Sequence, residues 1–154
     1  MRPLRSEFLF HLDLQVNPQP LAVGEVPLGQ RRITLITGGT FEGPRLRGRV
    51  VPGANAAWVV VRRDDVVQLE VRLTLQTDDG GWIYMTYPGI GHGSADVMHQ
   101  VNTGHAARPE DYYFRILPLF ETSAPAYAWL NKLVAVGTGE RAASGPNYDV
   151  YAVL

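Results

Sequence analysis

The chain has 154 residues, of which 45% are hydrophobic and 19% charged, a composition ordinary for one globular domain with a real core. Its 14 basic and 15 acidic residues leave a net charge of −1, so charge gives no reason to expect a nucleic acid or a membrane as a partner. The sequence contains no cysteine, which excludes disulfides, thiolate catalysis and cysteine-based zinc sites.

The N-terminal segment predicts a strand over 7–16 rather than a leader or a membrane span. Glu7, His11 and Asp13 interrupt its apolar residues. A signal peptide or a spanning helix needs an unbroken apolar run. We therefore expect a single domain over residues 1–154 and a cytoplasmic location.

Glycine and proline punctuate the rest of the chain at short intervals, with alternating apolar residues between them. There are 16 glycines and 11 prolines, and this spacing is typical of an all-β sandwich or barrel. Hairpin turns are expected at 63–65 and 78–81, and short helices at 94–101 and 124–130. The expected strands are 7–16, 30–37, 45–51, 57–63, 65–77, 81–88, 111–121, 131–137 and 147–153.

The connection over 89–111 is unusually long, and long connections are often binding loops or lids. Its Gly-His-Gly element carries His92, which could move a proton near neutral pH or could simply face solvent. The spacing of His92, His99 and His105 matches no metal-binding pattern, so we expect no metal site. The glycine-rich run at 89–93 also lacks the context of a nucleotide site.

Seven motifs run in order along nearly the whole chain. They are GGTFEGPRLRG at 38–48, VPG at 51–53, TDDG at 77–80, YFR at 113–115, FET at 120–122, YAWLN at 127–131 and YDVY at 148–151. In this order and spacing they resemble a bacterial family catalogued as domain of unknown function 3237, also called uncharacterised protein family 0311. The resemblance implies a calycin-like antiparallel β-barrel and implies no reaction.

One departure from the family pattern follows Pro52. Where the family usually reads GGADW, this chain reads GANAAW over 53–58, one residue longer and with Asn55 in place of the acid. If that acid acts as a base in relatives, this chain has lost it or reassigned its task. Asn55 and Trp58 are therefore candidate ligand-binding residues.

We expect an all-β fold, an antiparallel barrel of about eight to ten strands with one or two short helices. In strand 65–77 alternation places Glu70 and Arg72 on one face, about 7 Å apart. That face can meet water, or it can line the lumen of a closed barrel. Arg115 on strand 111–121 would then need a carboxylate or an anionic ligand. A structural Glu–Arg pair and a fork for a carboxylate, enolate or phenolate both remain open.

Two kinds of site residue follow from these patterns. The candidate catalytic residues are Glu70, Arg72, Arg115 and His92, with Glu70 or His92 moving a proton. Aromatic side chains could wall a cavity, although filling the core is their commoner role. The candidate ligand-binding residues are Asn55, Trp58, Trp82, Tyr84, Tyr113, Glu121 and Trp129.

Two functions are compatible with such a barrel. One is a cofactor-independent isomerase, dehydratase or lyase acting on a small carbonyl or aromatic compound, with Tyr84 or Tyr113 donating to an oxyanion. The other is a non-catalytic carrier or sensor for an apolar or anionic ligand. A lumen rich in ionisable groups favours the enzyme, and an apolar lumen favours the carrier. We expect a small-molecule partner, no cofactor, no metal, no nucleic acid, no membrane and a homo-oligomer, preferably a dimer.

Overall fold

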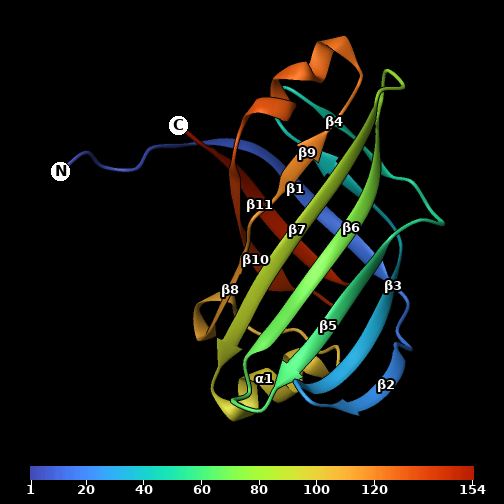
Figure 1. The fold of residues 1–154 in the computed structure, drawn as a ribbon, viewed down its shortest axis with the longest axis vertical. Helices are drawn as coiled ribbons and strands as arrows, with labels where there is room; N and C mark the ends of the chain where they lie inside the picture. Colours follow the sequence, from blue (N-terminus) through green and yellow to red (C-terminus); the bar gives the residue numbers. More distant parts are fainter.

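A computed structural model describes residues 1–154 and consists mainly of antiparallel strands. Eight of them close into a barrel (Figure 1). In order around the barrel these are β1 (Ser6–Val16), β3 (Gly29–Glu42), β5 (Ala56–Arg62), β6 (Val67–Thr77), β7 (Trp82–Gly93), β8 (Tyr112–Ile116), β10 (Ala135–Arg141) and β11 (Pro146–Val153). The barrel closes where β11 pairs with β1. The predicted fold class, an antiparallel β-barrel with short helices, is confirmed.

Three further strands lie beside the barrel strands. β2 (Leu21–Val26) pairs with β3, and β9 (Leu119–Glu121) pairs with β7. β4 (Arg47–Val50) pairs with both β3 and β6. These additions extend the sheet without changing the closed ring.

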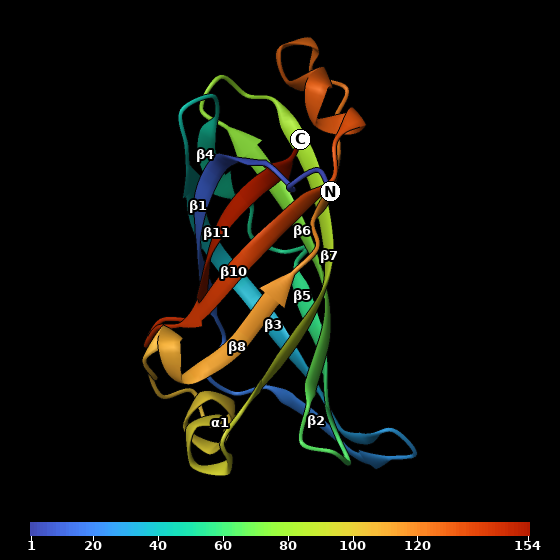
Figure 2. The ribbon, with the colours of Figure 1, turned by 90° about the vertical axis from the view of Figure 1, so that its left-hand side faces the viewer.

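The helices lie at opposite ends of the barrel (Figures 1 and 2). α1 (Ala95–Asn102) covers one end, and the 3₁₀ helix η2 (Pro125–Lys132) lies at the other. Tyr127 of η2 donates a hydrogen bond from its hydroxyl to Asp79 Oδ1 at 3.0 Å. The β6–β7 turn and η2 are therefore tied together. None of the helices has the length and apolar composition needed to cross a membrane.

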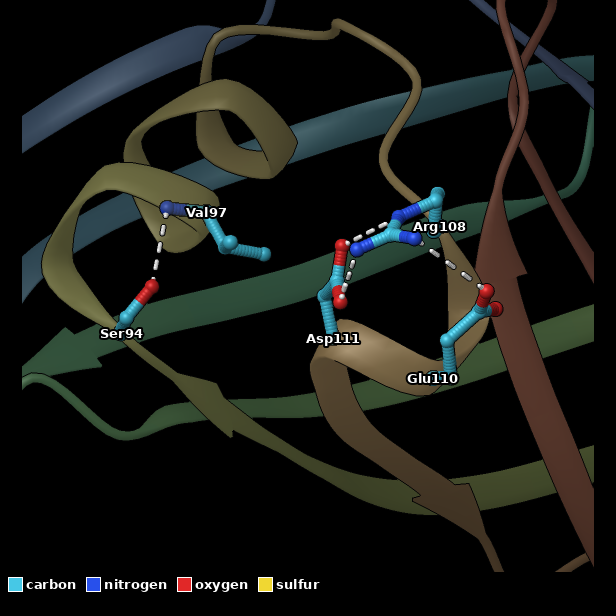
Figure 3. Close-up of polar contacts among 5 residues, drawn as sticks. All are labelled: Ser94, Val97, Arg108, Glu110 and Asp111. Atoms are coloured by element: carbon cyan, nitrogen blue, oxygen red, sulfur yellow. Dashed lines mark hydrogen bonds and ion pairs between the residues drawn. The ribbon is translucent and has the colours of Figure 1, made fainter.

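Side-chain contacts fix the path from α1 back into the barrel (Figure 3). Ser94 caps α1, because its hydroxyl accepts a hydrogen bond from the Val97 N–H at 3.4 Å. The chain then passes through the 3₁₀ turn η1 (Pro109–Asp111) and enters β8. Arg108 donates to both carboxylate oxygens of Asp111 at 2.8 and 2.9 Å, and its Nη1 lies 3.9 Å from Glu110 Oε1.

Strand alternation determines which side chains fill the barrel. On β6 the residues of one parity are buried and those of the other face outward. The buried set is Val67, Leu69, Val71, Leu73, Leu75 and Thr77. β7 shows the same alternation, with Tyr87 among its inward side chains. On β6 and β7 the apolar parity therefore faces the lumen.

The lumen is packed in the half nearer η2. There the Phe10 ring meets the rings of Phe41 and Phe120, with centroids 5.7 and 6.0 Å apart. Leu73 and Leu75 are fully buried beside this layer of the core. Close packing of this kind leaves no space for a ligand, so within the lumen only the half nearer α1 can hold one.

Most predicted strands are present, and the differences have local causes. The segment 89–111 is not one long loop, because β7 continues to Gly93 before α1 and η1 begin. Strand 111–121 divides at Pro118 into β8 and β9, since proline cannot donate a ladder hydrogen bond. The strand expected over 131–137 starts later, because η2 occupies residues up to Lys132, and β2 was not predicted.

Candidate functional site

The half of the lumen nearer α1 contains a cavity of about 100 Å³. Of its 20 lining residues, 14 are hydrophobic, so the walls suit a mostly apolar molecule. The barrel strands supply most of the wall. Met98, Val101 and Asn102 of α1 close one end. The predicted connection 89–111 therefore does contribute residues to the cavity.

Two arginines, Arg32 on β3 and Arg141 on β10, face this cavity. Neither forms an ion pair with a carboxylate; Arg32 instead donates from Nη2 to Asn102 Oδ1 at 3.2 Å. The Nε atom of Arg141 is buried without a hydrogen-bond partner. Burial, assisted by the charge of Arg141, lowers the pKa of Arg32, and burial lowers the pKa of Arg141. An anion between them would relieve both the desolvation and the mutual repulsion.

Two tyrosines stand deeper in the lumen. The rings of Tyr87 on β7 and Tyr148 on β11 pack edge to face with centroids 5.5 Å apart. The Tyr87 hydroxyl is buried, and its polar neighbour is the Tyr148 hydroxyl, which acts on its pKa but does not meet the geometry of a hydrogen bond with it. Burial raises the pKa of both phenols well above the usual value. Both hydroxyls are therefore protonated donors at neutral pH.

A third phenol supports Arg141 from β8. The Tyr112 hydroxyl accepts a hydrogen bond from the Arg141 backbone N–H at 2.6 Å, and burial raises the pKa of Tyr112. The cavity lining contains no Asp, Glu or His. Its charge and its hydrogen-bonding capacity therefore come from arginine and tyrosine, together with Thr34 and Asn102.

Of the two alternatives for Glu70 and Arg72, the structure shows the one in which their face of the strand meets water and not the lumen. Both are exposed on the outer face of β6, because the apolar parity of that strand faces inward. The Arg72 guanidinium lies 5.3 Å from the ring centroid of Trp58, which also projects outward from β5. These three residues form an outer group that has no contact with the cavity.

His92, Tyr113 and Arg115 also lie on the outer face of the barrel. The rings of His92 and Tyr113 stack with centroids 5.0 Å apart, and the Arg115 guanidinium lies 4.8 Å from the Tyr113 centroid. Arg115 Nη1 donates to the Phe114 carbonyl at 2.8 Å. The structure thus places the four predicted catalytic residues in two outer groups, away from the lumen.

The other predicted binding residues also lie outside the cavity. Asn55 is buried but structural, donating to the Val51 carbonyl at 2.5 Å and accepting from the Thr74 N–H at 2.7 Å. Trp129 on η2 stacks under the Arg45 guanidinium, 3.7 Å from the ring centroid. Trp82, Tyr84 and Glu121 do come together, in an open outer groove along β7 and β9. A binding role for this groove stays a prediction.

Sequence reasoning missed the cavity residues Arg32, Arg141, Tyr87, Tyr112 and Tyr148. The available signal was a polar side chain on the apolar parity of a strand. Tyr87, for example, shares its parity with Ile83 and Met85, which are both buried. The candidate residues were taken from the polar parity of each strand, and most of that parity forms the outer surface of the barrel.

Comparison with known proteins places this geometry in a family. A UPF0311 protein of Rhodopseudomonas palustris is 32% identical over 151 residues, covering 98% of this chain and 97% of that protein. Among the crystal structures with similar folds, that of a conserved protein of unknown function from the same species is 31% identical, with a TM-score of 0.94 over all of both chains. That of a beta-barrel like protein from Acinetobacter baumannii is 39% identical, with a TM-score of 0.86 over 100% of this chain and 98% of its own.

A more distant structure shows the fold alone. It is described as an enzyme from Penicillium herquei and is 23% identical, with a TM-score of 0.76 over 100% of this chain and 97% of its own. The family model described as "Protein of unknown function (DUF3237)" matches residues 4–153. The chain therefore belongs to this family, the one that its sequence motifs resemble.

Proposed function

We propose that the barrel binds a small, mostly apolar molecule that carries an acidic oxygen, such as a carboxylate, an enolate or a phenolate. One observation carries the proposal: Arg32 and Arg141 face the same apolar cavity, and neither has a carboxylate partner. Desolvated arginine without a counter-charge is costly, and a ligand oxygen can accept charge-assisted hydrogen bonds from guanidinium groups. The apolar wall would then hold the remainder of the molecule.

Carriage or sensing is the function that the cavity supports best. The lining has no carboxylate and no imidazole, so a proton-transfer residue of the usual kind is absent from it. Glu70 and His92 project from the outer surface and cannot supply that role inside the lumen. A site built from cations and phenols in an apolar wall binds and orients an anion without needing to transform it.

A cofactor-independent reaction on a carbonyl compound is the second candidate, and the unpaired Tyr87 hydroxyl favours it. This protonated phenol, with the arginines, could stabilise a developing enolate in an isomerisation, dehydration or lyase step. The ligand itself would have to accept the proton, because burial keeps the cavity tyrosines protonated. The fold similarity to a protein described as an enzyme is compatible with this candidate.

Isothermal titration of the protein with 2-naphthoate and the uncharged 2-naphthamide tests the proposal. We expect the carboxylate to bind and the amide to bind at least about tenfold more weakly. Arg32→Met or Arg141→Met should weaken naphthoate binding by about 10-fold to 100-fold. Arg31→Met is the matched control, because Arg31 has the opposite parity on β3. Equal affinity for acid and amide, or unchanged affinity in both arginine variants, would refute an anion site.

Deuterium exchange separates the two candidates. A keto acid that binds is incubated with the protein in deuterated water and followed by NMR at the carbon next to the carbonyl. Exchange faster than in buffer, and slower again in Tyr87→Phe, supports enolate chemistry. Binding with no accelerated exchange supports a carrier or sensor.

A further inference from the structure

The arginines and the unpaired phenol occupy different parts of the cavity. Arg32 is bonded to α1 through Asn102, and a Cβ added at Gly104, just after α1, would lie 3.3 Å from Arg141 Nη2. Both cations therefore lie at the end of the lumen that α1 covers. Tyr87 lies within β7, between Met85 and Gly89, and its side chain is fully enclosed. A bound molecule must extend inward from the arginines to reach it.

Aromatic packing holds the Tyr87 ring in place. The Tyr148 ring meets the ring of Tyr87 at 5.5 Å and that of Phe114 at 5.4 Å, both edge to face. A Cβ on Gly139 would lie 2.7 Å from a Phe114 ring carbon and 2.8 Å from a Tyr148 ring carbon, so only glycine leaves these rings their space. The Tyr148 ring, against which the Tyr87 ring packs, therefore has little room to move.

A buried hydroxyl without a partner needs an explanation, because it costs free energy in the empty protein. The lining supplies no carboxylate or imidazole acceptor, and the neighbouring Tyr148 hydroxyl does not meet the geometry of a hydrogen bond with Tyr87. An atom of a bound ligand is one group that can form the missing hydrogen bond with the Tyr87 hydroxyl. Sites of this kind reject analogues that lack the matching polar atom, because binding such an analogue leaves a buried protein group unpaired.

We propose that the ligand is an oxygenated aromatic acid that is recognised at two points. Its acidic group lies between Arg32 and Arg141, its ring lies against Tyr148 and Phe114, and a second oxygen, as a hydroxyl or a carbonyl, bonds to the Tyr87 hydroxyl. This inference rests on the proposed function, because it assumes that the lumen is the binding site. It adds the ligand class and assigns Tyr87 as the residue that determines specificity.

Matched pairs of acids test the second contact point. Isothermal titration compares benzoate with 3- and 4-hydroxybenzoate, and 2-naphthoate with 6-hydroxy-2-naphthoate and 6-acetyl-2-naphthoate. In the unaltered protein, at least one oxygenated acid should bind about tenfold or more tightly than its parent. In Tyr87→Phe this preference should fall to about one, with the affinity for the parent acid unchanged.

Tyr151→Phe is the control, because Tyr151 has the outward parity of β11 while Tyr148 faces the lumen. It should keep the full preference. Two results would overturn the second contact point and leave the anion site intact. One is that the parent acids bind as tightly as every oxygenated partner, and the other is that the preference persists in Tyr87→Phe. If none of the acids binds the unaltered protein, the proposed function fails and this inference fails with it.

Discussion

Arg32 on β3 donates a hydrogen bond to the side chain of Asn102, the last residue of α1, at 3.2 Å. The contact joins a barrel strand to the helix that closes the cavity. It also occupies a guanidinium group that an anionic ligand would use. Because a guanidinium group has several N–H donors, an anionic ligand could bind Arg32 while the bond to Asn102 is kept.

Asn102→Ala should loosen α1 without disrupting the barrel. Loss of one partly buried hydrogen bond to a charged group should cost about 1 to 2 kcal/mol locally. Amide hydrogen exchange in α1 should become faster, while exchange in β6 and β7 stays the same. Unchanged exchange throughout α1 would show that apolar contacts through Met98 and Val101 alone hold the helix.

Tyr87→Phe should stabilise the protein in the absence of ligand. The substitution removes a buried hydroxyl that has no hydrogen bond, and the ring packing against Tyr148 is kept. We expect the free energy of unfolding to rise by about 1 kcal/mol in urea titrations. Tyr112→Phe is the opposite case, because it deprives the Arg141 N–H of its acceptor, and should cost about 1 to 2 kcal/mol. A loss of stability in Tyr87→Phe would mean that its hydroxyl has a partner.

Gly91→Leu should fill the cavity from β7. Gly91 lines the cavity, and a Cβ added there would meet no atom closer than 3.6 Å, so a side chain has room to enter. We expect a folded protein with ligand binding reduced by at least about tenfold. Circular dichroism would check the fold, and titration with 2-naphthoate would measure binding. Gly91→Ala, which adds one methyl group, should retain binding.

His11 should make stability depend on pH. Burial lowers its pKa, but the hydrogen bond to Asp149 at 2.7 Å and the charges of Asp13 and Asp149 outweigh this and raise the pKa above 6.5. The charged form is therefore favoured by folding. Its contribution is complete below the unfolded pKa of 6.5 and disappears as pH rises through the folded value.

The side chains of His11 and Asp149 are 41% and 46% exposed, so solvent screening should keep this contribution below about 1 kcal/mol. His11→Gln should lower the free energy of unfolding at about pH 5.5 and have a smaller effect at about pH 8.5. Urea titrations at the two values measure the difference. An equal effect of the substitution at both would contradict an ionised pair.

Alternation, turn residues and motifs in the sequence were sufficient to predict an antiparallel barrel. Side chains of successive residues face opposite sides of a strand, so Val67 and Glu70 had to lie on different faces whatever the tertiary structure. The Asp-Gly turn before β7 and the helix after Ser94 were also local, because each depends on residues adjacent in the chain. The extent of β7 beyond Pro88 was not local, since β6 and β8 supply its partners there.

Which face encloses the lumen, and which polar residues meet inside it, was decided only by closure of the barrel. Closure pairs β1 with β11 and places Arg32, near the start of the chain, in the same cavity as Arg141, near its end. The sequence alone determined that the strands have an apolar and a polar face. It could not show which side chains converge, because convergence depends on pairings between residues far apart in the chain. Burial then left two arginines without a protein counter-charge and a tyrosine hydroxyl without a well-formed hydrogen bond, although all three residues are inconspicuous in the sequence.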